Sequence, residues 1–213
     1  MRSKTGLVPD AYFTGTKLWW LMQNINDIKS RILSDHLIFG TIDSWLIWNL
    51  TRGIRDSLTP DRRGAHVTDY SNASRTMLFD INRLQWDRNL LEIEGNIPTD
   101  VLPLPRPSSE RQAYGFVGKE IAKLFNYADA PVTGDVGDQQ AALFGQACYN
   151  EGSVKSTYGT GNFILMNTGN KIIRSGANLL ARFFILQKRE GQTTRLKAAY
   201  LLRGLPCSGL RTT

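Results

Sequence analysis

Cysteine and histidine are scarce in this sequence, with two residues of each among 213. So few thiols exclude a disulfide framework and a cysteine-rich zinc site, and no transition-metal site is expected. Long apolar runs are also missing. Near the N-terminus the longest run, from Leu18 to Met22, is far shorter than the roughly 20 residues that span a bilayer. The first residues lack the apolar stretch of a secretory signal, so neither a membrane span nor secretion is predicted.

The excess of positive charge is confined to one end of the chain. The formal net charge is +7, but residues 181–213 contain seven of the 26 Lys and Arg and only one of the 19 Asp and Glu, which leaves residues 1–180 nearly balanced. The basic end has no recognisable nucleic-acid-binding motif, so a nucleic-acid partner is not predicted. With 41% apolar and 21% charged residues, the rest of the chain can form a packed core.

Apolar spacing predicts helices in the first half of the chain. One helix is expected over residues 16–34, where apolar side chains recur every three or four residues (Leu18, Leu21, Ile25, Ile28, Ile32). A second, buried helix is expected within 39–50, with Ile42, Trp45 and Leu46 facing inward and Asp43 and Ser44 as local caps. Residues 51–65 and the proline-rich 97–118 are expected to be irregular, and residues 120–125 to form a short helix.

The second half of the chain contains two features suited to chemistry. A strand over 130–136 leads through Gly137 into a helix over 138–145, which places the Asp138 carboxylate at a helix N-terminus. There it can accept a proton from a substrate hydroxyl while Gln139 holds a neighbouring hydroxyl, although the same residues are also typical of an N-capping Asp followed by a solvated Gln.

Strands over 153–158 and 162–167 flank the turn Gly159-Thr160-Gly161. Such a hairpin can present bare backbone amides and a hydroxyl to a phosphate group, although most turns of this kind only satisfy backbone conformation. The default interpretation of Tyr12 and of the Trp19-Trp20 pair is a place in the core or at its rim, and alternation points Phe163 inward.

Taken together, five runs of residues resemble the glycerol-phosphorylating branch of the FGGY family of carbohydrate kinases, in the family's order. They are YFTGTKLWWLMQN at 12–24, GTIDSWLIW at 40–48, HVTDYSNASRTMLF at 66–79, GDQQAALFGQ at 137–146 and YGTG at 158–161. The Asp-Gln-Gln run and the run from His66 to Phe79 favour this branch over the pentulose kinases. The resemblance covers about residues 3–180.

The resemblance implies an α/β, actin-like ATPase (ribonuclease H-like) fold and an ATP- and Mg²⁺-dependent transfer of a phosphoryl group to glycerol. It implies that Asp138 is the general base and that Gln139, Tyr12 and Phe163 contact glycerol, while Thr160 and Gly161 contact the ATP phosphates. It also implies a cytoplasmic enzyme and homo-oligomers of the full-length family members. Four further residues of the matched runs are interpreted as scaffold, and His66 as a structural histidine; the four are Lys17, Asp69, Asn72 and Arg75.

Against the family pattern the fold is expected to be incomplete. Residues 1–150 match part of the N-terminal, glycerol-binding domain, residues 151–180 the start of the C-terminal, nucleotide-binding domain, and residues 181–213 are a divergent basic tail. The family's N-terminal phosphate-binding hairpin and adenine pocket have no counterpart here. Two interpretations follow, an active kinase segment or a catalytically inactive, truncated remnant. A coding frameshift is one explanation of the tail, because codons exist for Arg195–Cys207 that, read one nucleotide earlier, encode the family-like string LEGSIFVAGFAV.

Overall fold

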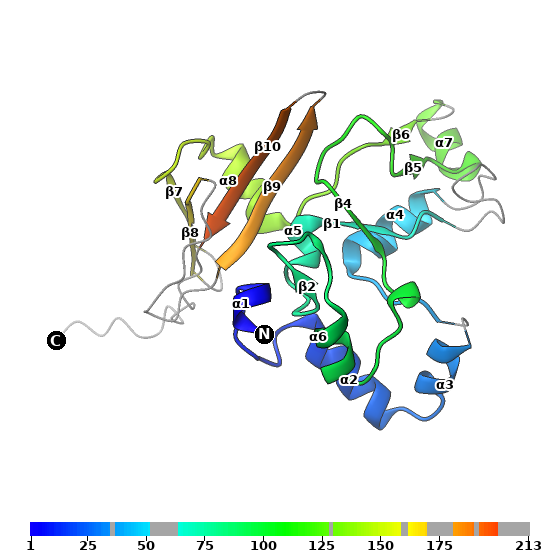
Figure 1. The fold of residues 1–213 in the computed structure, drawn as a ribbon. Helices are drawn as coiled ribbons and strands as arrows, with labels where there is room; N and C mark the ends of the chain where they lie inside the picture. The colour runs from blue at the N-terminus through cyan, green and yellow to red at the C-terminus, as the bar shows by residue number, and fades with distance from the viewer. Residues whose placement is uncertain are drawn as a thin grey trace.

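The computed structural model describes residues 1–34, 37–51, 64–127, 130–158, 162–169, 181–189 and 192–199. Figure 1 shows short helices and small sheets, with the antiparallel pair β9 and β10 crossing in front of helix α8 in this view. In the described residues the helical elements are, in chain order, α1 (Arg2–Thr5), α2 (Thr14–Asn24), α3 (Ile28–Leu33), α4 (Ile42–Thr51), α5 (Tyr70–Ala73), α6 (Arg88–Ile93), the 3₁₀ turn η1 (Thr99–Val101), α7 (Lys119–Phe125) and α8 (Asp138–Gly145).

The described strands form four separate sheets. β1 (Val67–Asp69) pairs in parallel with β4 (Leu104–Arg106), β2 (Phe79–Asp80) pairs with β3 (Gln85–Trp86), and β5 (Gly115–Phe116) pairs with β6 (Pro131–Val132). The largest sheet is antiparallel, in the order β7-β8-β10-β9, with β7 (Val154–Tyr158), β8 (Asn162–Asn167), β9 (Ala181–Arg189) and β10 (Gln192–Ala199). Parallel pairing of β1 with β4 brings together segments that lie far apart in the sequence.

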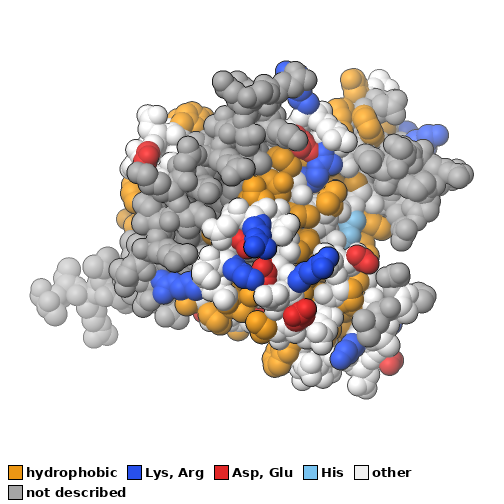
Figure 2. Space-filling model, viewed as in Figure 1, with side chains coloured by type: hydrophobic (Ala, Val, Ile, Leu, Met, Phe, Trp, Pro, Cys, Tyr) orange, Lys and Arg blue, Asp and Glu red, His pale blue; other side chains and the backbone are white. Residues whose placement is uncertain are grey.

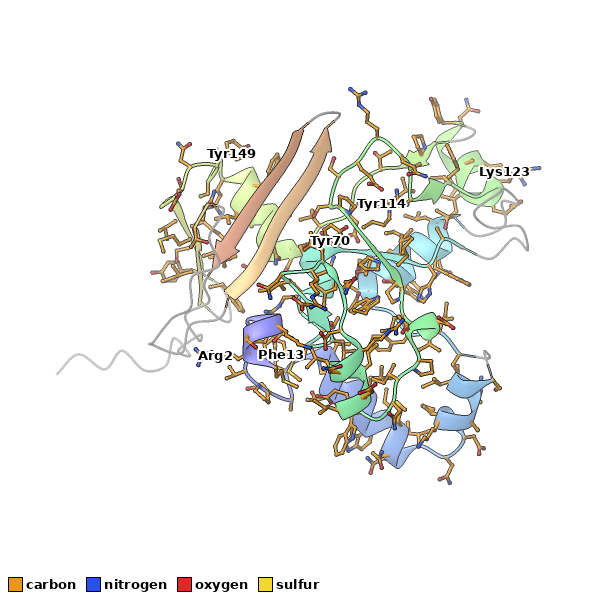
Figure 3. All side chains as sticks on the ribbon, in the orientation of Figure 1. Arg2, Phe13, Tyr70, Tyr114, Lys123 and Tyr149 are labelled. Atoms are coloured by element: carbon orange, nitrogen blue, oxygen red, sulfur yellow. The ribbon has the colours of Figure 1, made fainter. Side chains whose placement is uncertain are left out.

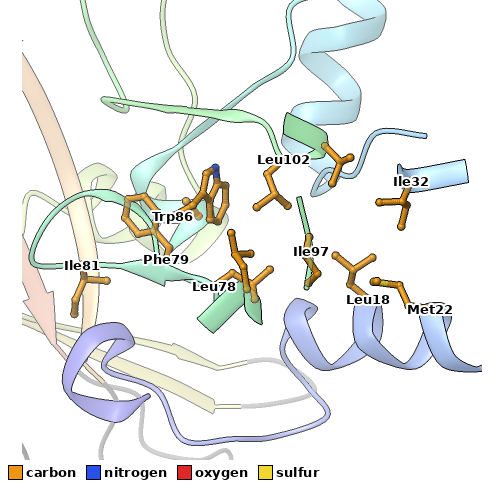
Figure 4. Close-up of a cluster of buried hydrophobic side chains, with 12 residues drawn as sticks. Leu18, Met22, Ile32, Leu78, Phe79, Ile81, Trp86, Ile97 and Leu102 are labelled. Carbon is orange, nitrogen blue, oxygen red and sulfur yellow. The ribbon is translucent and has the colours of Figure 1, made fainter. Parts of the chain in front are cut away.

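The main hydrophobic core lies where α2, α5, α6 and the β2–β3 hairpin meet. Its members are drawn in Figure 4 and are Leu18, Met22, Ile32, Ala73, Leu78, Phe79, Ile81, Trp86, Leu91, Ile97, Val101 and Leu102. The Phe79 and Trp86 rings meet edge to face with centroids 5.5 Å apart. The buried indole N–H of Trp86 donates to the Pro103 carbonyl at 2.8 Å, so the one polar atom of this ring pair is satisfied.

The single helix predicted over residues 16–34 is wrong, because the chain forms two helices there. α2 ends at Asn24 and α3 begins at Ile28, and between them Asp27 has a φ of 67°. Asn and Asp tolerate this left-handed conformation and are poor helix formers, so the segment from Asn24 to Asp27 favours a break. Ile25, one of the apolar positions on which the single-helix prediction rests, is 43% exposed and lies in the break.

Helix α4 forms close to its predicted place but with the opposite face buried. The side chains of Ile42, Trp45 and Leu46, predicted to be buried, are 71%, 60% and 48% exposed. The helix packs against β1 through the buried Ile47, which lies in one apolar cluster with Val67, and through the Asp43 carboxylate, which accepts a hydrogen bond from the Thr68 hydroxyl at 2.6 Å. The buried face therefore combines an apolar contact with a polar one, and apolar periodicity alone did not indicate it.

Other predicted elements agree with the structure. The short helix near 120–125 is confirmed as α7, the helix over 138–145 as α8, and the strands over 153–158 and 162–167 as β7 and β8. The strand over 130–136 is reduced to β6 and an isolated bridge between Ser109 and Gly134. Residues 97–118 contain only short elements. Most of the predicted loop at 51–65 lies outside the described residues.

The C-terminal residues enter the largest sheet. β9 and β10 pair along most of their length, and β10 pairs with β8 through Ala198 and Ala199, opposite Asn167 and Met166. β9 also contacts helix α5. Part of the segment expected to be only a divergent tail is therefore strand, while residues 200–213 lie outside the described part of the chain.

Candidate active site at the N-terminus of helix α8

Asp138 is the first residue of α8, and its side chain is exposed. The residue in the N-cap position is Gly137, which has extended backbone (φ −61°, ψ 144°) and no side chain with which to cap the helix. One Asp138 carboxylate oxygen accepts from the Gln139 backbone N–H at 2.7 Å, and the other lies 3.4 Å from the Gln139 side-chain amide nitrogen. The capping interpretation of Asp138 is therefore wrong, and the carboxylate is presented to solvent.

The backbone leading into α8 is held by the turn between β1 and α5. The Gly137 N–H donates to the Ser71 hydroxyl at 2.8 Å, and that hydroxyl donates to the Asp69 carboxylate at 2.9 Å. On the other side, the Asp69 N–H donates to the Asp135 carboxylate at 3.1 Å. A Cβ atom at position 137 would lie 2.8 Å from the Gln140 side-chain oxygen and 3.4 Å from the Ser71 and Asn72 side chains, so any residue other than glycine would displace the Gln140 side chain.

Asp69 is the centre of this support and is fully buried. Its carboxylate caps α5 by accepting the backbone N–H groups of Ser71 at 2.9 Å and Asn72 at 2.8 Å, and it also accepts the Ser108 hydroxyl at 2.5 Å. Burial raises the pKa of Asp69, while these hydrogen bonds oppose the increase. The interpretation of Asp69 and Asn72 as scaffold is confirmed by this capped turn.

Two further carboxyl groups lie beside Asp69. Burial, the charges of Asp69 and Asp43, and a hydrogen bond with Asp43 raise the pKa of Asp135 to about 8. Asp135 therefore carries a proton near neutral pH, as expected when carboxyl groups share a partly buried space. The buried Tyr114 lies close enough to Asp69 and Asp135 for their charges to add to burial in raising its pKa, and its hydroxyl donates to the Pro107 carbonyl. Asp135 lies three residues before Asp138, so this cluster lies beside the segment that leads into α8.

Tyr12, Phe13 and Arg75 form a second group near Asp138. The Tyr12 ring is 63% exposed and meets the buried Phe13 ring edge to face, with centroids 5.4 Å apart. The Arg75 guanidinium carbon lies 4.8 Å from the Phe13 ring centroid and 5.9 Å from that of Tyr12. Figure 3 labels Phe13 beside α1 at the start of α2. These contacts place a cation against two aromatic faces, the arrangement of cation–π pairs.

Arg75 also connects Tyr12 with Asp138. Burial lowers the pKa of Arg75 to about 10, and the interactions with the Tyr12 hydroxyl and the Asp138 charge limit the decrease. Among the described residues, no hydrogen-bond partner faces its buried Nη1 atom. The scaffold interpretation of Arg75 missed this orientation, since a sequence run gives no signal for which side chain faces a site. Lys17, the other predicted scaffold cation, lies 6.0 Å from the Tyr12 ring.

A buried lysine supports Gln139 from strand β7. The Lys155 side chain is only 2% exposed, and its ammonium lies 2.7 Å from the Gln139 side-chain oxygen and 2.5 Å from the Thr157 hydroxyl. Sequence reasoning did not single out Lys155, because strand alternation alone does not distinguish a buried lysine from a solvated one.

The other predicted site residues have different surroundings. Phe163 is half-buried and packs against a small core made of Leu143, Cys148 and Leu165, on the buried side of α8, which fits its inward alternation. Thr160 and Gly161 lie outside the described residues. His66 is structural as predicted, with Nε2 at 2.7 Å from the Phe39 carbonyl oxygen and with burial lowering its pKa.

Exposed apolar side chains are numerous on this chain. Trp19 and Trp20, predicted for the core or its rim, are 44% and 53% exposed, and Tyr158 is 77% exposed. Figure 2 shows apolar side chains interspersed with charged ones over one face of the molecule.

Along the part of the chain that the structure describes, no helix has the length and apolar character needed to cross a membrane. Within the same residues, no three acidic, histidine or cysteine side chains are grouped to hold a metal ion.

Comparison with known families gives a match over most of the chain. Residues 1–145 match the N-terminal domain of the FGGY family of carbohydrate kinases. A glycerol kinase of Thermoanaerobacter sp. (strain X514) is 52% identical over 180 residues, which are 84% of this chain and 33% of that protein. A glycerol kinase of Saccharolobus islandicus (strain M.14.25) is 47% identical over 204 residues, 96% of this chain and 36% of that protein, so this alignment extends beyond residue 180.

Solved structures agree with these sequence matches. The crystal structure of Plasmodium falciparum glycerol kinase with ADP is 36% identical, with a TM-score of 0.82 over 98% of this chain and 37% of that one. The xylulose kinase of Rhodospirillum rubrum, at 18% identity and a TM-score of 0.70, shares the fold. The chain thus spans about a third of the length of the curated relatives it matches.

Proposed function

Because this chain belongs to the FGGY family of carbohydrate kinases, with part of the family's actin-like ATPase fold, we propose that it provides the glycerol-binding half of a glycerol kinase site. The relatives at about 50% identity are named glycerol kinases, and an accessible carboxylate at the head of α8 supports the role of proton acceptor. This exposed carboxylate, held by the Gln139 backbone amide, is the observation that carries the proposal.

In the proposed reaction, Asp138 takes the proton from a terminal hydroxyl of glycerol. The oxygen of that hydroxyl forms a bond to the γ-phosphorus of ATP as the bond from this phosphorus to the ADP oxygen breaks, which gives glycerol 3-phosphate and ADP. An aspartate of ordinary acidity suffices, because the alcohol becomes strongly acidic only as the bond to phosphorus forms. The protein's main contribution is to align the two oxygens with phosphorus and to offset the developing charge.

The neighbouring residues have matching roles in this proposal. Gln139 binds a second hydroxyl of glycerol, and the exposed Tyr12 ring lies against the polyol. Phe163 packs on the carbon backbone of glycerol, and Thr160 and Gly161 contact the ATP phosphates. Mg²⁺ enters with ATP as part of the substrate complex, where it neutralises phosphate charge.

The proposal keeps the division of the chain at about residue 150. Residues 1–150 belong to the glycerol-binding domain, and residues 151–180 begin the nucleotide-binding domain. A cytoplasmic location and homo-oligomers of the full-length protein follow from the same family resemblance.

The frameshift hypothesis for residues 181–213 is tested by the nucleotide sequence, since codons incompatible with the shifted frame would exclude it.

A coupled assay for ADP release with glycerol and MgATP tests the proposed reaction. We expect turnover that falls by about 10²- to 10⁴-fold in Asp138→Asn, which keeps the shape of the side chain but removes the base. Asp100→Asn is the matched control, because Asp100 is an exposed acidic residue of the η1 turn. Cooperative unfolding without any turnover would instead identify the chain as an inactive remnant.

A further inference from the structure

The ammonium group of Lys155 is buried next to a predicted substrate contact. Lys155 lies in β7, opposite Leu165 of β8, and only 2% of it is exposed. Its Nζ atom donates to the Gln139 side-chain oxygen at 2.7 Å, and it lies 2.5 Å from the Thr157 hydroxyl. Burying an ammonium is costly, and an apolar residue of similar length would fill the same volume without that cost.

We propose that Lys155 is a positioning residue, which fixes the orientation of the Gln139 amide and, through it, the Asp138 carboxylate. This inference rests on the proposed function, in which Asp138 is the base and Gln139 a glycerol contact. It adds a role for a residue that lies beyond residues 1–145, the part that matches the family's N-terminal domain.

The two ends of the Gln139 side-chain amide differ in their hydrogen-bonding capacity. A side-chain amide has an oxygen that only accepts and a nitrogen that only donates, and the two can exchange places by a rotation of the terminal bond. The ammonium of Lys155 has three donors and no acceptor, so only the oxygen of Gln139 can face it. The amide nitrogen then faces the Asp138 carboxylate, where it lies 3.4 Å from one oxygen.

This arrangement has a chemical consequence at the base. With the nitrogen of Gln139 turned toward it, one oxygen of Asp138 has a donor neighbour, while its other oxygen accepts the Gln139 backbone N–H. Without Lys155 the amide is free to reverse, and its oxygen would then face the carboxylate and repel it. Lys155 therefore selects the one amide orientation that stabilises the ionised base and leaves an amide proton for a glycerol hydroxyl.

Side-chain amide signals in nuclear magnetic resonance spectra test this positioning without any substrate. We expect Lys155→Met to move the Gln139 side-chain amide signals and to bring their two protons closer in shift, because the charged donor on the oxygen is lost. Lys155→Arg, which keeps a cationic donor, should restore part of the change. Lys123→Met is the matched control, because Lys123 is an exposed lysine that pairs with Glu120. Unchanged Gln139 signals in folded Lys155→Met would overturn the proposal.

A second variant covers the case in which Lys155→Met does not fold. Gln139→Leu changes a half-buried residue at the head of α8 and removes the same contact from the other side. We expect the Nζ signal of Lys155 to shift in this variant, and a Lys155 signal identical to that of the wild type would contradict the inferred contact.

Steady-state kinetics then separate positioning from general stability. In Lys155→Met we expect kcat/KM for glycerol to fall by about tenfold, the loss of roughly one hydrogen bond to a charged group. In a Gln139→Ala background the same substitution should have almost no further effect, since the two residues act in series. Equal losses of kcat/KM in both backgrounds would refute the proposal that Lys155 acts through Gln139. A wild-type chain without turnover would refute the proposed function, whereas the amide signals would still decide the positioning role.

Discussion

Replacing Asp135 by asparagine should make the stability of the protein less sensitive to pH. Asp135 lies between the Asp69 backbone N–H and the Asp43 carboxyl group, and these surroundings raise its pKa to about 8. In the native protein Asp135 therefore keeps its proton near neutral pH, whereas in the unfolded chain it loses the proton above its ordinary value near 3.8. Asparagine has nearly the shape of the protonated acid but cannot ionise.

The sign and size of the effect follow from proton linkage. Between pH 5 and 7 the native state binds one proton more than the unfolded state at this position, so the free energy of unfolding falls as pH rises. The slope is about 1.4 kcal/mol per pH unit, or about 3 kcal/mol over this range, and the loss is complete above pH 8, where both states are ionised. Asp69, whose pKa is also raised by burial, acts in the same direction.

Urea unfolding at pH 5, 6 and 7 measures this slope. His66 has an opposite effect, because its lowered pKa makes the native protein lose stability as pH falls below about 6.5, but it is present in both proteins and cancels in their difference. We expect the wild type to lose about 3 kcal/mol more than Asp135→Asn between pH 5 and 7. Asp100→Asn should keep the wild-type slope. Equal slopes in the wild type and Asp135→Asn would refute the conclusion that Asp135 is protonated near neutral pH in the native protein.

Three further predictions concern the scaffold around the site. Asp69→Ala should lower the free energy of unfolding by about 3 kcal/mol, because it removes the α5 cap and leaves buried donors unpaired; urea unfolding that shows less than about 1 kcal/mol would contradict this support. Phe79→Ala should cost about 3–5 kcal/mol in the same measurement, and a smaller loss would mean that the core collapses around the cavity. On α4, Ile47→Ala should cost about 2–4 kcal/mol and Trp45→Ser less than about 1 kcal/mol; the reverse order would contradict the observed orientation of this helix.

The elements that the sequence predicts well are those whose signals are local. The run from Asp138 to Gly145 consists largely of good helix formers after a glycine, and it forms α8 as expected. The strands β7 and β8 are short alternating segments on either side of the sequence Gly159-Thr160-Gly161, and they pair in the antiparallel way that such a short separation predicts. The position of Asp138 at the head of a helix could therefore be predicted from nearby residues alone.

The features that the sequence could not predict depend on distant partners. Helix α4 buries Asp43, whose carboxylate accepts a hydrogen bond from the hydroxyl of Thr68, 25 residues away. Apolar periodicity contains no information about such a polar partner. The same holds for Lys155 of β7, which is buried with its ammonium group bonded to the side chain of Gln139 on α8. The break at Asp27 has a local cause, but a long apolar repeat concealed it.

The most direct test of the proposed site is a crystal structure of this chain with bound glycerol. The account predicts a terminal hydroxyl of glycerol at about 2.6–3.2 Å from the Asp138 carboxylate, with a second hydroxyl at the Gln139 amide and the polyol against Tyr12. Glycerol bound away from the head of α8, with Asp138 facing only solvent, would contradict it.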